Sequence, residues 1–134
     1  MSKIDVLYII DDDKIYHFTI KKTIQQIDIA NNLLSFYNGE EAINFLDEAI
    51  SNSQNMPDVI LLDINMPVMD GWQFMESYVL LKPRIGKKIQ IYMVSSSVYE
   101  EDIERAKSIS DISDYIIKPI TKNQLFQISE ALAS

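Results

Sequence analysis

The chain has 134 residues, of which 47% are hydrophobic and 24% are charged, a composition that suits one globular domain with a buried core. It contains no cysteine, which excludes disulfides and thiolate metal sites. A formal net charge of −8 argues against contact with nucleic acid or with anionic membrane surfaces. The first residues, MSKIDVLYIIDDD, form neither a signal peptide nor a membrane span. We therefore expect one cytoplasmic domain over residues 1–134.

Strands and helices are predicted to alternate along the chain. Apolar runs predict strands at 6–10, 33–37, 59–62, 89–94 and 115–117. Between the first four strands, apolar residues recur at helical spacing from Tyr16 to Ile27, from Ile43 to Ile50 and from Trp72 to Val79. Two further helices are expected to open on capping boxes, Ser97 with Glu100 and Thr121 with Gln124.

This alternation predicts an α/β fold with helices on both faces of a parallel sheet. The strands are near-continuous apolar runs, which is typical of strands buried on both faces. Right-handed crossovers then favour a doubly wound five-stranded sheet of order 2-1-3-4-5, a flavodoxin-like (βα)5 fold. In such a sheet, ligands bind outside the carboxyl ends of the strands, where the strand order reverses.

Acidic residues follow two of the predicted strands at that edge. Asp11, Asp12 and Asp13 come directly after the first strand, and Asp63 comes directly after the third. Asp13 is well placed to cap the following helix. The other three carboxylates would repel one another by about 4 kcal/mol per pair at ~4 Å and an effective dielectric near 20. Mg²⁺, a hard cation with oxygen ligands, would relieve this repulsion.

Two other strands end on polar residues that complete a chemical set. Ser95 follows the fourth strand in YMVSSS, and Lys118 follows the fifth in YIIKP. A carboxylate nucleophile, a metal-binding acid pair, a hydroxyl donor and a lysine together favour phosphoryl transfer. A carboxylate can accept the phosphoryl group as an acyl phosphate.

Four motifs with their spacing resemble the receiver domain of two-component response regulators, over the whole chain. They are IIDDD (9–13), LLDINMPVMDG (61–71), MVSS (93–96) and DYIIKPI (114–120). The resemblance implies that Asp63 accepts the phosphoryl group and that Asp11, Asp12 and Asp63 hold Mg²⁺, with Asp12 the more direct ligand of the acid pair. It further implies a metal contact from the backbone carbonyl of Asn65, a cis peptide bond between Lys118 and Pro119, an active-site role for Lys118, and switch roles for Ser95 and Tyr115.

The resemblance also implies partners. The phosphoryl donor would be a sensor histidine kinase or a histidine phosphotransfer protein. We expect a stand-alone, chemotaxis-regulator-like receiver that has no output domain and signals by protein contact. The expected contact face is formed by the fourth helix, the fifth strand and the fifth helix, with Tyr99, Ile103 and Ile120 as candidate residues. Phosphorylation-dependent homodimerisation remains an alternative use of such a face.

Three other functions remain open from the residues. A haloacid dehalogenase-like phosphohydrolase would use Asp11 as nucleophile in a D-x-D-x-[TV] motif, loosely met by Asp11, Asp13 and Ile15. That family needs an acid pair after a late strand, where this chain has Ser95-Ser96 and Lys118-Pro119. A flavodoxin-like nucleotide binder would need a Gly-rich phosphate loop in place of the acids. A degenerate receiver that only docks would not need the complete set of site residues.

Two single residues are assigned packing roles. His17 is the only histidine and lies in the first predicted helix beside Tyr16 and Phe18, where a surface or packing role is expected rather than phosphorylation. Trp72 follows Gly71 at the start of the third helix and is expected to pack in the core.

Overall fold

The computed structural model describes residues 3–133. Within this range, five strands alternate with five α-helices, as the sequence predicts. Their bounds are β1 Ile4–Ile10, α1 Lys14–Ile27, β2 Ala30–Phe36, α2 Gly39–Asn52, β3 Val59–Leu62, α3 Gly71–Leu81, β4 Gln90–Ser95, α4 Glu100–Lys107, β5 Ile112–Ile117 and α5 Lys122–Ala133, with a 3₁₀ turn η1 at Lys82–Arg84 after α3. None of these helices has both the length and the apolar character needed to cross a membrane.

The strands form one parallel sheet of order β2-β1-β3-β4-β5, which confirms the predicted doubly wound fold. Hydrogen bonds between neighbouring strands continue one residue past three strand ends. The amide of Asp11 donates to the Phe36 carbonyl at 3.0 Å, that of Asp63 to Ile10 at 2.9 Å and that of Lys118 to Ser95 at 2.9 Å. The main chain of these polar residues is therefore fixed by the sheet itself.

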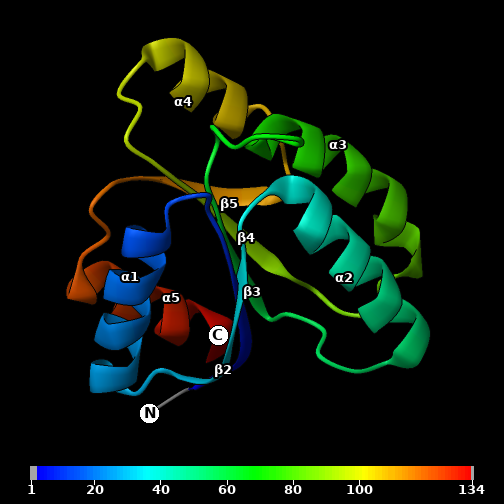
Figure 1. Cartoon of the computed structure of the whole chain (residues 1–134), viewed down its shortest axis with the longest axis horizontal. Helices are drawn as coiled ribbons and strands as arrows, with labels where there is room; N and C mark the ends of the chain where they lie inside the picture. Colours follow the sequence, from blue (N-terminus) through cyan, green and yellow to red (C-terminus); the bar gives the residue numbers. More distant parts are fainter. Residues whose placement is uncertain (1–2, 134) are drawn as a thin grey trace.

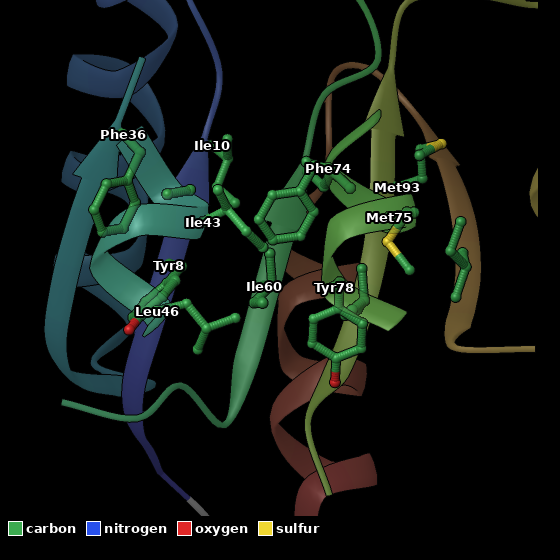
Figure 2. Close-up of a cluster of buried hydrophobic side chains, with 14 of the residues drawn as sticks. Tyr8, Ile10, Phe36, Ile43, Leu46, Ile60, Phe74, Met75, Tyr78 and Met93 are labelled. Carbon is green, nitrogen blue, oxygen red and sulfur yellow. The ribbon is translucent and has the colours of Figure 1, made fainter. Parts of the chain in front are cut away.

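Helices cover both faces of the sheet (Figure 1). α1 and α5 pack on one face through a cluster that includes Ile20, Ile24, Leu125 and Ile128. α2, α3 and α4 cover the other face. Figure 2 shows the larger core on that side, where aliphatic and aromatic side chains from the sheet meet those of α2 and α3; its labelled residues are Tyr8, Ile10, Phe36, Ile43, Leu46, Ile60, Phe74, Met75, Tyr78 and Met93.

Several helix starts follow the sequence signals, and one does not. The Asp13 carboxylate accepts the amides of Ile15 and Tyr16, so it caps α1 as expected. Thr121 and Gln124 form the predicted capping box, with bonds of 2.9 and 3.1 Å. The box predicted for Ser97 and Glu100 is wrong. α4 begins after Tyr99, which makes no side-chain cap, and the Ser97 hydroxyl donates to Asp102 at 2.6 Å instead.

Candidate functional site

The polar residues that follow the strands converge at the carboxyl edge of the sheet. Asp11 and Asp12 leave β1, Asp63 leaves the neighbouring β3, Ser95 ends β4 and Lys118 follows β5. One carboxylate oxygen from each of Asp11, Asp12 and Asp63 lies within 4.8 Å of the others. The Lys118 ammonium lies 2.6 Å from Asp11 Oδ2 and 3.8 Å from Asp63 Oδ2. The structure thus brings together the acids and the lysine that the sequence predicted to meet.

The two acids after β1 have different surroundings. Asp11 is buried, and each of its oxygens has a donor: the Asp13 amide reaches Oδ1 at 2.9 Å and Lys118 reaches Oδ2 at 2.6 Å. Asp12 is exposed. Of the two carboxylates, that of Asp12 is therefore the more accessible, and its role as the more direct metal ligand stays a prediction.

Asp63 is a buried acid with a raised pKa. Its side chain is buried with only 8% of the residue exposed. Burial and the charges of Asp11 and Asp12 raise the pKa of Asp63 to about 6, although Lys118 and the amide of Ile64 oppose the shift. The Ile64 amide donates to Asp63 Oδ1 at 2.9 Å, which fixes the carboxylate plane. A cation beside Asp63 would favour the ionised carboxylate and so oppose this rise in the pKa.

The donor set suits Mg²⁺. The acid group offers only oxygen ligands, and Mg²⁺ in proteins is held by one or two carboxylates together with waters and phosphate oxygens. Asn65 lies exposed two residues after Asp63. Its predicted role as a backbone ligand remains a prediction.

The close approach of α3 to Asp63 depends on Gly71. A Cβ at this position would lie 3.0 Å from the Cα of Ile64, 3.2 Å from the carbonyl carbon of Asp63 and closer still to the Asp63 carbonyl oxygen. The Gly71 amide donates to Ile64 at 2.8 Å, and Asp70 and Gln73 form a capping box over the same turn. The DGWQ segment therefore holds the loop after β3 against the helix.

The predicted switch residues are linked through Ser97. Ser95 is buried, and its Oγ accepts the amide of Ser97 at 3.1 Å. The Tyr115 hydroxyl donates to the carbonyl of the same residue at 2.8 Å. Tyr115 is half-buried and packs against the core. One peptide segment thus connects the end of β4 with the middle of β5.

The predicted contact face stays a prediction, and the structure shows only how exposed its candidate residues are. Tyr99 is exposed and Ile103 is half-buried, as a contact surface requires. Ile120 was wrongly included: only 8% of it is exposed, because it packs between the sheet and α5. Val98 and Ile117 are exposed beside Tyr99 and Tyr115 and were missed, because their apolar character alone predicts burial.

Sequence reasoning also missed two residues of α1 beside the site. The Tyr16 ring lies under Lys118, with Nζ 4.4 Å from the ring centroid. His17 is buried, as a packing role requires, but its Nε2 also lies 2.7 Å from the Asp11 carbonyl and 3.1 Å from that of Phe36. Both partners are acceptors, so Nε2 carries the hydrogen and ties the loop after β1 to β2. Trp72 is buried in the core, as expected.

The geometry disfavours the phosphohydrolase alternative. Asp13, the second acid of the D-x-D motif, is exposed and caps α1 with its carboxylate. β4 ends in Ser95 and β5 is followed by Lys118, where that family would need a pair of acids.

The peptide bond between Lys118 and Pro119 is cis, which confirms the prediction made from the family resemblance.

Comparisons with known proteins identify the class. Residues 7–130 match the family model of the response regulator receiver domain. A crystal structure of a two-component response regulator from Cytophaga hutchinsonii is 30% identical, covers 98% of both chains and superposes with a TM-score of 0.84. A response regulator receiver protein from Dyadobacter fermentans is 29% identical over 95% of this chain and 96% of its own, with a TM-score of 0.80. The chain belongs to the response regulator receiver domain family.

A curated relative shows the same domain in a longer protein. The sensor histidine kinase CheAY of Helicobacter pylori is 32% identical over 120 residues, which are 90% of this chain but only 14% of that protein. A receiver domain therefore also occurs as a small part of a much longer protein.

Proposed function

We propose that this receiver domain is a cytoplasmic phospho-accepting switch of a two-component system. Asp63 takes a phosphoryl group from the phosphohistidine of a sensor kinase or phosphotransfer protein, and the phosphorylated domain signals by protein contact. The observation that carries the proposal is the convergence of three carboxylates and Lys118 at the carboxyl edge of the sheet. The domain acts as a switch, with only its own phosphorylation and dephosphorylation as chemistry.

The chemistry follows from the residues around Asp63. A carboxylate oxygen of Asp63 forms the new bond to phosphorus, the phosphorus–nitrogen bond of the donor breaks, and the imidazole keeps the electron pair and takes a proton from water. Asp11 and Asp12 would hold Mg²⁺, which when bound supplies positive charge for the phosphoryl oxygens. Lys118 provides a second positive charge, because it already lies between Asp11 and Asp63.

The first test is phosphorylation by a small-molecule donor. With acetyl phosphate and Mg²⁺, intact-mass measurement should show one added phosphoryl group on the wild-type chain. The gain should disappear when EDTA replaces Mg²⁺, because the uncompensated acids repel the phosphate. Equal labelling with and without the metal would contradict the proposed role of the acid pair.

Signal transmission is proposed to run from Ser95 through Ser97. The phosphoryl group adds charge and three acceptor oxygens at Asp63, to which the Ser95 hydroxyl can donate. A rotation of the Ser95 side chain would alter its contact with the Ser97 amide. The Ser97 carbonyl accepts a hydrogen bond from the Tyr115 hydroxyl, and the Ser97 hydroxyl donates one to Asp102 of α4. We therefore place the two-state element in the segment from Ser95 to Tyr99, read out by Tyr115 and the exposed face of α4 and β5.

This route is tested by NMR with beryllofluoride and Mg²⁺, a mimic of the acyl phosphate. Amide shifts should reach Ser97, Asp102 and Tyr115 in the wild type. In Ser95→Ala, the shifts around Asp63 should persist while those at Tyr115 and in α4 shrink, because the hydroxyl donor is missing. Undiminished remote shifts in Ser95→Ala would rule out this route.

A further inference from the structure

An aromatic side chain of α1 lies against the lysine of the site. The Lys118 ammonium is 4.4 Å from the centroid of the Tyr16 ring, well inside the ~6 Å range of cation–π attraction. The ring is placed there by the start of α1, where the Asp13 carboxylate accepts the Tyr16 amide at 3.1 Å. Asp13 also directly follows Asp11 and Asp12 in the sequence. The start of α1 therefore places both the acid pair and the Tyr16 ring.

The contacts of Lys118 show why a third partner matters. Its ammonium is bonded to Asp11 at 2.6 Å and is 3.8 Å from the nearer oxygen of Asp63. To reach a phosphoryl group on Asp63, it must loosen the contact with Asp11. A ring face attracts a cation without a directed bond, so it can hold the ammonium at either end of this movement. Unlike a carboxylate, it carries no net negative charge toward the incoming phosphoryl oxygens.

The hydroxyl of Tyr16 has surroundings that differ from those of its ring. Within residues 3–133, its oxygen is buried and has no hydrogen-bond partner. Burial and the charges of Asp11 and Asp63 raise the pKa of the Tyr16 hydroxyl above its ordinary value. An unpartnered buried hydroxyl is unfavourable for folding. The contact of Tyr16 with the site is therefore made by its ring and not by its hydroxyl.

We propose that Tyr16 is a positioning residue for phosphoryl transfer, whose ring face holds the Lys118 ammonium in the pocket as it moves from Asp11 toward the phosphoryl oxygens on Asp63. This inference rests on the proposed function, because it assigns a role within the same reaction. Tyr16 itself makes no bond to the phosphoryl group. The ring is the functional part, and the hydroxyl is dispensable.

Two substitutions separate the ring from the hydroxyl. Tyr16→Leu removes the ring but keeps an apolar side chain, and Tyr16→Phe keeps the ring without its hydroxyl. We expect the initial rate of phosphorylation by acetyl phosphate, at saturating Mg²⁺, to fall about threefold to tenfold in Tyr16→Leu. Tyr16→Phe should stay within about twofold of the wild type. Phe18→Leu is the matched control, because Phe18 is an exposed aromatic of the same helix, and its rate should not change.

A double-substitution cycle distinguishes positioning from a general structural effect. In a Lys118→Ala background, Tyr16→Leu should cause no further loss of rate, because the ring then has no ammonium to hold. Three results would each overturn the proposal. They are an equal fold-loss of rate from Tyr16→Leu in both backgrounds, an unchanged rate in Tyr16→Leu, and a Tyr16→Phe variant as slow as Tyr16→Leu. If the wild type takes no phosphate at all, the proposed function fails as well, so the two failures are distinguishable.

NMR of the wild type provides a check that does not depend on the variants folding. The ε-methylene protons of Lys118 should be shifted upfield by the ring current of Tyr16. This shift should be present in the free protein and retained with beryllofluoride and Mg²⁺. Loss of the upfield shift in the beryllofluoride form would show that the ammonium leaves the ring and would overturn the proposal.

Discussion

Asp63→Asn is expected to make the metal-free protein more stable at neutral pH, by about 2–3 kcal/mol. The pKa of Asp63 is raised from its ordinary value of 3.8 to about 6, first by burial and then by the charge of Asp11. The folded state therefore binds this proton more tightly than the unfolded state does. Ionised Asp63 consequently lowers the stability of the fold, and an amide of the same shape removes that penalty.

The sign of the effect sets its pH dependence. Because the folded-state pKa is the higher one, the penalty is absent below about pH 4, grows between pH 4 and pH 6 and is fully present above that range. Urea unfolding of both proteins in EDTA from pH 4 to pH 8 measures it. Glu48→Gln, which removes an exposed charge on α2, is the matched control and should change stability by less than about 0.5 kcal/mol. If the wild type is at least as stable as Asp63→Asn at pH 7, ionised Asp63 does not lower the stability of the fold.

Gly71→Ala is expected to destabilise the fold by about 1–3 kcal/mol and to slow phosphorylation of the fraction that folds. The added methyl group would press on the main chain of Asp63 and Ile64, which cannot rotate away as a side chain could. α3 or the loop after β3 must therefore shift, and this loop carries Asp63.

The matched control for this substitution is Gly86→Ala. A Cβ at Gly86 would meet no atom within 4 Å, so the same change there should leave stability within about 0.5 kcal/mol of the wild type. Urea unfolding and acetyl phosphate labelling of both variants provide the measurement. Equal behaviour of the two alanine variants would mean that the close approach at Gly71 is not a constraint.

The sequence predicted the central part of the fold better than its edges. The bounds of β3 are those of its apolar run, 59–62, because a central strand is buried along its whole length. The two edge strands, β2 and β5, begin three residues earlier than predicted. Their first residues include exposed polar side chains such as Asn31 and Asp114, which periodicity cannot distinguish from a loop.

Some residues of the site could be predicted from the sequence, and others could not. Asp11, Asp63 and Lys118 could be brought together from the sequence, because parallel strands end at one edge and each residue directly follows a strand. Tyr16 could not, because its ring reaches Lys118 only through the packing of α1 beside the sheet, and its spacing is that of any core residue. The Asp70–Gln73 capping box was overlooked although its D-x-x-Q spacing is visible in the sequence.

The position of the acyl phosphate tests the central claim most directly. Borohydride reduces an aspartyl phosphate to homoserine, which peptide mass spectrometry can place on the chain after labelling with acetyl phosphate and Mg²⁺. We predict homoserine at position 63 in the wild type and none anywhere in Asp63→Asn. Homoserine at position 11, or labelling that persists elsewhere in Asp63→Asn at wild-type stoichiometry, would contradict the assignment of Asp63 as the phosphoryl acceptor.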